Sequence, residues 1–245
     1  MIIDIHNHIL PGVDDGAKDM EETKEMIKIA VEEGIGAIVA TPHYEVGMGA
    51  EILAKYQRAY SEVSDYIEKH QIPLELYQGN EIFYSESITE TLQENGVYGI
   101  NGTRYVLVEF SIDTGYHTIE RALNNLLYAG YRPILAHTER YIELHNLKKI
   151  AELVRLGTRV QINANSVLGK EGWRMKRFCL QLMKNHLVHV VGTDAHGSSR
   201  RRPVIKECAE YIEKKLGRSY CKLICEKNPQ KILEGEKISG KDRVD

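Results

Sequence analysis

The stretch that decides the fold is MIIDIHNHIL, residues 1–10, where the apolar run IIDIH (2–6) leads directly into His6-Asn7-His8. Two histidines two residues apart on a strand point to the same face of the sheet. Such a pair chelates well, and its imidazoles suit Zn, Fe or Mn. The pair alone is weak evidence, but Asp194-Ala195-His196 repeats the same spacing near the other end of the chain.

Working outward, short β-branched runs alternate with stretches of helical periodicity. Strands are predicted at 2–6, 36–41, 74–79, 104–109, 132–137, 158–163 and 187–193. Helices are predicted at 20–34, 118–129, 146–156, 173–185 and about 203–225, followed by a short last helix that Asn228-Pro229 caps. Strand and helix alternating through seven rounds indicate parallel strands.

Six of the seven predicted strands end in a side chain that could bind a metal. The candidates, with the nearby Asp15, are His6, His8, Asp15, His43, Glu81, Glu109, His137, Asp194 and His196. In an open sheet only the strands at a switch point contribute to a site. A closed or nearly closed barrel brings this many strand ends together. We therefore predict an irregular (β/α)7 TIM-like barrel in one domain, residues 1–234, with a polynuclear metal site at the carboxyl ends of the strands and a frayed polar tail at 235–245.

The candidate ligands are imidazoles and carboxylates without a thiolate. This set points to a hydrolytic site that holds Mn, Fe, Zn or Mg. Nine groups are too many for one catalytic ion, so about two or three ions with bridging carboxylates fit better. The alternative for Glu81 and Glu109 is a salt bridge at the rim. No comparable set of Arg or Lys lies at the neighbouring strand ends to pair with all the carboxylates.

Arginines near these ligands favour a phosphoryl substrate over a carbonyl one. Arg140 lies three residues past His137, and Arg200-Arg201-Arg202 lie just past His196. Guanidinium groups bind phosphoryl oxygens bidentately. We expect Arg140 first and Arg202 second to be catalytic and substrate-binding, with a solvated loop as the alternative for the arginine triplet.

Composition excludes other classes of protein. The 245 residues carry a net charge of −3, which does not support attraction of the whole molecule to nucleic acid or an anionic membrane. No apolar run approaches membrane-spanning length, and the N-terminus has no basic region or cleavage site of a signal peptide. We therefore expect a cytoplasmic protein without membrane insertion. Its four cysteines are expected to be reduced core thiols, and none is followed six residues later by the Arg of a thiol-dependent tyrosine phosphatase loop.

These motifs resemble the PHP (polymerase and histidinol phosphatase) superfamily over nearly the whole chain, through HxH, TPH, a strand-end Glu, AH and a closing DxH. More narrowly, five segments resemble the bacterial CpsB/CapC (YwqE-like) group of manganese-dependent protein-tyrosine phosphatases: residues 1–16, 79–82, 108–110, 136–141 and 161–163. The resemblance implies an irregular barrel and a trinuclear Mn²⁺ site.

The resemblance also implies a ligand assignment. One metal would take His6, His8, Glu81 and Asp194, a second would share Glu81 and add Glu109 and His137, and a third would take Asp15, His43 and His196, with Asp14 as the alternative to Asp15. The implied substrate is the phosphotyrosine tail of a bacterial tyrosine kinase that controls capsule or exopolysaccharide synthesis. A metal-bound hydroxide would attack, without a covalent intermediate. The group includes homo-oligomers, which leaves the oligomeric state open.

Four tyrosines on the predicted rim loops, Tyr44, Tyr84, Tyr116 and Tyr141, are candidates to flank a phosphotyrosine ring, with ordinary loop or core positions as the alternative. Of these, Tyr44 and Tyr141 are predicted to bind the substrate. Three rival functions share the predicted fold or site. They are a histidinol-phosphate-type small-molecule phosphatase, a PHP nuclease, and a non-enzymatic metal-loaded interaction module. Mild acidity argues against the nuclease, and the complete ligand set with Arg140 argues against the interaction module.

Overall fold

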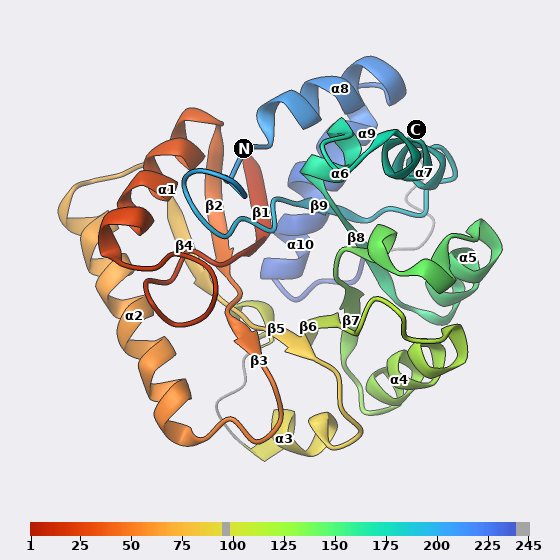
Figure 1. Cartoon of the computed structure of the whole chain (residues 1–245), viewed down its shortest axis with the longest axis horizontal. Coiled ribbons are helices and arrows are strands. Elements are labelled where there is room, and N and C mark those ends of the chain that lie inside the picture. Colours follow the sequence, from red (N-terminus) through yellow and green to blue (C-terminus); the bar gives the residue numbers. More distant parts are fainter. Residues whose placement is uncertain (95–98, 239–245) are drawn as a thin grey trace.

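The structure, a computed structural model, describes residues 1–94 and 99–238 (Figure 1). Its strands all pair in parallel and form two hydrogen-bonded sets, β1-β2-β4 and β3-β5-β6-β7-β8-β9. The strands are β1 (Ile2–Asn7), β2 (Ile35–Ala40), β3 (His43–Tyr44), β4 (Glu75–Gln78), β5 (Glu81–Phe83), β6 (Tyr105–Glu109), β7 (Arg132–Leu135), β8 (Arg159–Asn163) and β9 (Val190–Gly192). Each predicted strand has a counterpart among them.

The two sets belong to one circuit of strands, because two of the predicted strands are interrupted. β2 continues into β3 across Thr41-Pro42, and β4 continues into β5 across Gly79-Asn80. The Gly79 N–H donates to the Ala40 carbonyl over 2.9 Å, and the Glu81 N–H donates to the Pro42 carbonyl over 3.1 Å. Pairing between the two paths therefore persists across the interruption.

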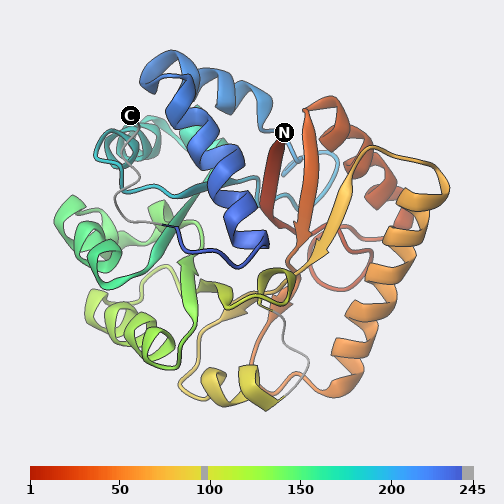
Figure 2. The same cartoon turned by 180° about the vertical axis from the view of Figure 1, so that it is seen from behind.

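The circuit closes between the first and last strands. The Asp194 N–H donates to the His6 carbonyl and the His8 N–H donates to the Ala195 carbonyl, each over 2.9 Å. Asn7 and Ala195 form a parallel bridge at the same place. In the two opposite views most helices lie around the outside of the curled strands, whereas α10 lies near the centre (Figure 2). The predicted irregular seven-stranded α/β barrel is confirmed.

The helices are α1 (Met20–Glu32), α2 (Ala50–Lys69), α3 (Ile88–Glu94), α4 (Tyr116–Tyr128), α5 (Leu147–Leu156), α6 (Ala164–Leu168), α7 (Trp173–Lys184), α8 (Lys206–Leu216), α9 (Arg218–Lys222) and α10 (Asn228–Leu233), with a π-helical turn at Leu223–Lys227. The Asp19 side chain caps α1 by accepting from the Glu22 N–H over 2.9 Å, as its spacing predicts. Asn146 similarly caps α5 by accepting from the Lys148 N–H over 2.9 Å.

The helical region predicted at about 203–225 is confirmed over most of its length, but it is interrupted at Gly217, whose φ of 92° is open to glycine and strained for other residues. The predicted cap of the last helix is wrong. Asn228 does not cap a separate last helix, because its own backbone is helical and the π-helical turn runs into α10. Its side chain instead donates to the His189 carbonyl over 2.9 Å. The long helix α2 was not among the predicted helices.

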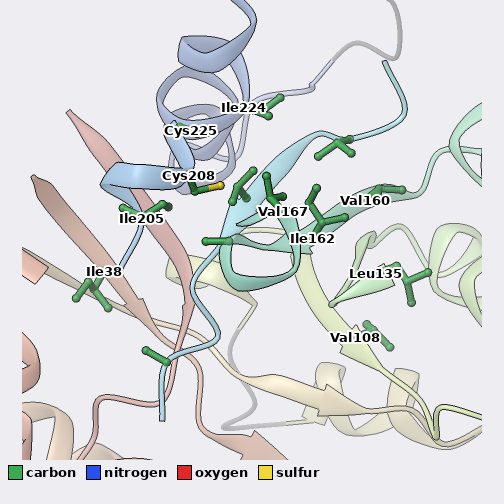
Figure 3. Packing of buried hydrophobic residues seen from close by; sticks show 14 of the residues in the cluster. Ile38, Val108, Leu135, Val160, Ile162, Val167, Ile205, Cys208, Ile224 and Cys225 are labelled. Atoms are coloured by element: carbon green, nitrogen blue, oxygen red, sulfur yellow. The ribbon is translucent and has the colours of Figure 1, made fainter. Parts of the chain in front are cut away.

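The core has two parts, on the two faces of the strands. Val106 and Val108 of β6 pack in the larger cluster, with buried residues of the surrounding helices. Figure 3 shows part of that cluster, including Val108 and its neighbours on other strands. Leu107, between the two valines, packs in a smaller cluster with Ile232 and Leu233 of α10. This alternation is the period of two expected of a strand that is buried on both faces.

Part of the predicted tail also packs against the barrel. The Tyr105 hydroxyl donates to the Glu236 carbonyl over 2.7 Å and accepts from the Ile238 N–H over 3.0 Å. The Ile238 side chain is buried. Residues 235–238 therefore pack against the barrel, whereas the sequence predicts a frayed tail from residue 235 onward. The rest of the predicted tail, residues 239–245, lies outside the described residues. Across the described parts of the chain, no helix has both the length and the apolarity needed to cross a membrane.

Candidate metal centre

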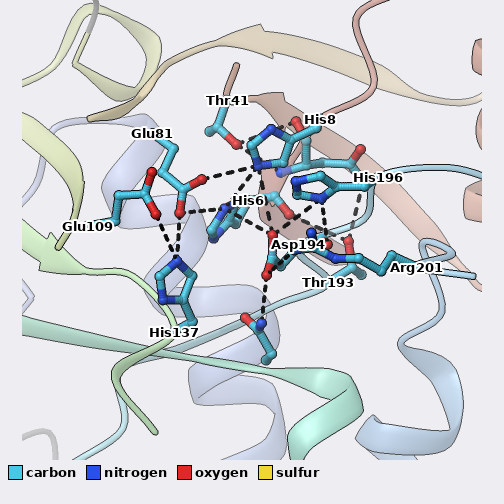
Figure 4. Close-up of polar contacts among 12 residues, drawn as sticks. His6, His8, Thr41, Glu81, Glu109, His137, Thr193, Asp194, His196 and Arg201 are labelled. Atoms are coloured by element: carbon cyan, nitrogen blue, oxygen red, sulfur yellow. Dashed lines mark hydrogen bonds and ion pairs between the residues drawn. The ribbon is translucent and has the colours of Figure 1, made fainter. Parts of the chain in front are cut away.

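The structure brings all nine predicted ligand side chains together at the carboxyl ends of the strands (Figure 4 shows most of them). They come from β1, from the loop after it, from the first residues of β3 and β5, from the end of β6, and from the loops after β7 and β9. The side chains are those of His6, His8, Asp15, His43, Glu81, Glu109, His137, Asp194 and His196, each within 4 Å of another member of the set.

Glu81 lies at the middle of this set. Its Oε1 is 3.1 Å from His6 Nε2 and 2.9 Å from His137 Nε2. Its Oε2 is 3.2 Å from His8 Nε2 and 3.1 Å from His43 Nδ1. Burial alone would raise the pKa of this carboxyl, but His6 and His137 hold it well below its usual value. One buried carboxylate therefore contacts four imidazoles, which is the geometry of a bridging group.

Two further carboxylates tie the remaining histidines to this centre. Asp15 Oδ1 lies 3.2 Å from His43 Nε2 and 3.3 Å from His196 Nε2. Asp194 Oδ1 lies 3.4 Å from His6 Nε2 and 3.5 Å from His196 Nδ1. In the described residues three groups have ligand atoms within 4.8 Å of one another: His8, Asp15, His43 and His196; His6, His8 and Glu81; His43, Glu81 and Glu109.

Asp14 and Asp15 play different parts, which the sequence left open. Asp14 Oδ2 lies 2.8 Å from His8 Nδ1 and also accepts from the His43 N–H over 3.2 Å. It therefore fixes the ring of His8 with Nε2 facing the centre, as supporting carboxylates do behind metal-binding histidines. The Asp15 side chain, 67% exposed, faces His43 and His196 directly.

Sequence reasoning missed a layer of amides beneath the centre. Gln161 Oε1 accepts from the His137 N–H over 2.6 Å and lies 3.2 Å from His6 Nδ1. Gln161 Nε2 donates to Asn163 Oδ1, and Asn163 Nδ2 donates to Asp194 Oδ2, each over 2.8 Å. The available signal was two amides, two residues apart, that alternate with the apolar Val160 and Ile162 on β8. Such a pair supports ligands from three other strands.

The histidines of the centre differ in their affinity for protons, because burial and the neighbouring His8 lower the pKa of His196 to about 4, whereas carboxylates raise the pKa of two others. Burial alone would lower the pKa of His8, but hydrogen bonds with Asp14 and Glu81 raise it to about 10. Burial likewise opposes charge on His137, yet Glu109 and Glu81 raise its pKa to about 10. The neighbouring carboxylates therefore favour positive charge on His8 and His137. Nitrogen and oxygen donors with surplus negative charge fit divalent metal ions.

Two arginines reach the centre, and one of them is not the predicted one. Arg140 Nη1 lies 3.1 Å from Asp194 Oδ2, and Arg201 Nη2 lies 2.6 Å from the same oxygen. Among the described residues Arg202 forms no ion pair. The difference arises in the loop, where the Arg201 carbonyl accepts from the His196 N–H over 2.8 Å and holds this residue beside the site. In this structure Arg201, rather than Arg202, makes the ion pair with Asp194, and the substrate-binding role of Arg202 stays a prediction.

Tyr44 and Tyr141, which are predicted to bind the substrate, are not exposed at the opening of the candidate metal centre. Tyr44 is 2% exposed and Tyr141 is fully buried, and both belong to the larger core cluster. The Tyr141 hydroxyl accepts from the Phe110 N–H over 3.1 Å. Both side chains are buried, although the Tyr141 ring lies 5.8 Å from the ring of the ligand candidate His137. Their burial in this structure argues against the predicted contact of these rings with a substrate.

Comparisons with known proteins agree with this geometry. The family model described as "Capsular polysaccharide synthesis, CpsB/CapC" matches residues 2–234. The tyrosine-protein phosphatase CpsB of Streptococcus pneumoniae is 34% identical over 243 residues, covering 97% of this chain and 100% of that protein. The tyrosine-protein phosphatase YwqE of Bacillus subtilis is 34% identical over 238 residues, covering 97% and 93%.

Solved structures extend the comparison. One matching crystal structure comes from work on YwqE of Bacillus subtilis and CpsB of Streptococcus pneumoniae, which are described as unique metal-dependent tyrosine phosphatases. It matches with a TM-score of 0.90 and 33% identity, and the match covers 97% of this chain and 96% of that one. A histidinol phosphate phosphatase from Lactococcus lactis has a TM-score of 0.59 at 13% identity, covering 88% and 94%, and shares the fold. The chain therefore belongs to the CpsB/CapC family of capsular polysaccharide synthesis proteins.

Proposed function

We propose that the protein is a metal-dependent phosphotyrosine-protein phosphatase. One observation carries the proposal. Nine imidazole and carboxylate side chains converge beside Arg140 and Arg201, in a chain that aligns over 97% of its length with named tyrosine phosphatases. The cluster of imidazoles and carboxylates supports metal-assisted hydrolysis. The similarity to named tyrosine phosphatases supports phosphotyrosine as the substrate class.

The donor set supports about two or three ions, with Mn²⁺ as the proposed native metal. Imidazole nitrogens and carboxylate oxygens also suit Fe, Zn and Mg. Divalent ions in such a site lower the pKa of water and neutralise charge on phosphoryl oxygens. The proposed ligand groups are His6, His8, Glu81 and Asp194 for one ion, Glu81, Glu109 and His137 for a second, and Asp15, His43 and His196 for a third.

The chain's own contribution beyond the ligands is to hold the phosphoryl group. Arg140 and Arg201 approach Asp194 Oδ2 and remain 25% and 38% exposed. Arg140 Nη2 also lies 3.2 Å from Glu171 Oε1, so an entering anion would compete with two carboxylates for this guanidinium group. Charge-assisted hydrogen bonds from guanidinium groups orient phosphoryl oxygens and are stronger than those from neutral donors. The two arginines thus orient the substrate for attack from the metal side.

We also propose that no cysteine takes part in the reaction. All four cysteines are buried. Burial raises the pKa of the Cys179 and Cys208 thiols, which disfavours thiolates. Cys221 donates to the Ala209 carbonyl, between helices α8 and α9 and apart from the candidate ligands. These features support hydrolysis in which water, rather than a side chain, attacks phosphorus.

The proposed substrate is the phosphotyrosine-bearing tail of a bacterial tyrosine kinase that controls capsule or exopolysaccharide synthesis, in the cytoplasm. The family's role in capsular polysaccharide synthesis and the relatives that are tyrosine-protein phosphatases support a phosphotyrosine substrate in that process. The rival substrate is a small phosphomonoester such as histidinol phosphate. Only a fold-level likeness, at 13% identity, favours it.

The test is phosphate release from a phosphotyrosine peptide and from histidinol phosphate, each with Mn²⁺ and with EDTA. We expect Mn²⁺-dependent turnover of the peptide and loss of turnover after chelation, with metal analysis to confirm removal. Higher kcat/KM on histidinol phosphate would replace the protein substrate with a small one. Full activity in the verified metal-free protein would overturn the mechanism.

A further inference from the structure

Two isoleucines form an exposed apolar pair on neighbouring loops. Ile112 is 54% exposed in the loop after β6, and Ile142 is 64% exposed in the loop after β7. The Ile142 N–H donates to the Ile112 carbonyl over 3.3 Å, so the backbones of the two loops are joined at these residues. Single exposed hydrophobic residues are ordinary on protein surfaces. Two exposed isoleucines joined by a backbone hydrogen bond are a more specific feature than a single exposed residue.

The pair adjoins the candidate metal centre. Ile112 comes three residues after the ligand candidate Glu109, and Ile142 comes two residues after Arg140. Beneath the pair, the hydrogen bond from the Phe110 N–H to the Tyr141 hydroxyl joins the same two loops over 3.1 Å. The two isoleucines therefore sit on a braced support at the carboxyl rim of the barrel, next to the proposed phosphoryl site.

The substrate brings a group that the centre itself cannot accommodate. Phosphotyrosine carries an aromatic ring directly on its phosphate, whereas the centre consists of imidazoles, carboxylates and guanidinium groups. Tyr44 and Tyr141, the aromatic residues predicted to flank the ring, are buried in the core. Apolar side chains exposed at the rim can supply a contact for the ring, because burial of apolar area favours binding.

We propose that Ile112 and Ile142 form an apolar shelf that packs against the phosphotyrosine ring and makes the enzyme selective for aryl phosphates. The inference rests on the proposed function. A second exposed pair, Val46 and Ile52, lies beyond β3 on either side of the loop to α2, and these residues are only 37% and 36% exposed. They offer less open area than the shelf and serve as the comparison pair.

The experiment compares the double variant Ile112→Ser/Ile142→Ser with the unchanged protein, both loaded with Mn²⁺. Substrates are a phosphotyrosine peptide and p-nitrophenyl phosphate, which share an aryl phosphate but not a peptide. We expect KM to rise about tenfold for both, since roughly this factor follows from losing the apolar contact of a partly buried ring. We expect kcat and inhibition by inorganic phosphate to stay unchanged, because the phosphoryl site is intact.

Three control variants accompany the double variant. Ile112→Val/Ile142→Val keeps an apolar surface and should retain the original KM. Tyr128→Ser removes a side chain that is 91% exposed at the last residue of α4, away from the carboxyl rim, and should change neither constant. Val46→Ser/Ile52→Ser tests the comparison pair. Metal content and melting temperature are measured for all, and the single serine variants replace the double variant if it does not fold.

The outcomes separate the shelf from the proposed function. Unchanged KM in the serine variants, while the unchanged protein hydrolyses the peptide, overturns the shelf alone. A rise in KM for the peptide only would assign the isoleucines to a neighbouring peptide residue and overturn their contact with the ring. A rise in KM confined to Val46→Ser/Ile52→Ser would place the ring beside Val46 and Ile52 and overturn the shelf. Absence of turnover of both aryl phosphates by the unchanged protein overturns the proposed function and the shelf with it.

Discussion

The Nε2 atoms of His6 and His8 lie 3.3 Å apart and face the same carboxylates. Behind them, Gln161 Oε1 and Asp14 Oδ2 face the two Nδ1 atoms and can accept a hydrogen from each ring. This arrangement directs both Nε2 lone pairs inward. Two lone pairs at such a distance repel each other unless a proton or a metal ion lies between them. We therefore expect metal binding to displace protons from the site.

The first prediction concerns pH and thermal stability. The metal-free protein should become less stable as pH rises from 6.5 toward about 10, because the pKa values of His8 and His137 are raised from 6.5 to about 10 by hydrogen bonds to carboxylates, which outweigh the effect of burial. A histidine whose pKa is higher in the folded state than in the unfolded state stabilises the folded protein most at pH values below its unfolded-state pKa. This contribution is lost as pH rises through the folded-state pKa. Calorimetric melting temperatures across this range would measure the effect.

The Mn²⁺-loaded protein provides the control for that series. Metal ions replace the protons, so its melting temperature should vary less over the same pH range and should exceed that of the metal-free protein. A metal-free melting temperature that rises with pH between 6.5 and 10 would contradict the charge balance described for the centre.

The second prediction separates two glutamates. Glu81 contacts four imidazoles and is 1% exposed, whereas Glu109 contacts His43 and His137 and is 16% exposed. Glu81→Ala should therefore lose more bound metal than Glu109→Ala, with at least about a tenfold larger loss of affinity. Metal content after dialysis, measured by mass spectrometry on both variants, is the readout. Equal losses would refute the role of Glu81 as the bridge.

The third prediction concerns the neighbouring aspartates. Asp15→Asn should remove the ion proposed beside His43 and His196 and leave the other ions bound. Asp14→Ala should instead weaken metal binding by about 10- to 100-fold, because His8 loses the partner that orients it. Titration of the metal-free variants with Mn²⁺ distinguishes a lost site from a weakened one. The same stoichiometry and affinity in both variants would contradict the division of labour between the two aspartates.

Much of the fold and of the centre could be predicted because the signals are local. Apolar runs marked each strand, and His or carboxylate residues at strand ends marked the convergence, since the carboxyl ends of parallel strands meet at one rim. The caps of α1 and α5 depend on side chains one turn away. Gln161 and Asn163 were harder to assign, because an amide in a strand shows its purpose only through partners on other strands.

The failures arise where tertiary contacts decide the conformation. Sequence alone does not reveal that His137 and Asp194 adopt positive φ angles of 31° and 52°, which redirect the chain at the centre. It also does not reveal that Tyr141 turns inward to Phe110. The choice among Arg200, Arg201 and Arg202 likewise depends on a backbone contact to His196 within an irregular loop.

That choice gives the fourth prediction, in which the adjacent arginines serve as each other's controls. Arg201→Ala should lower kcat/KM on a phosphotyrosine peptide by about 10- to 100-fold, the effect of losing a charge-assisted hydrogen bond to a phosphoryl oxygen. Arg202→Ala should leave kcat/KM unchanged, because Arg202 forms no ion pair within the described residues. Arg140→Ala should resemble Arg201→Ala while retaining metal, since Asp194 keeps its contacts with Asn163 and the histidines. Loss of metal in Arg140→Ala would make that arginine structural, and a larger effect at Arg202 than at Arg201 would show that the loop takes another conformation with substrate bound.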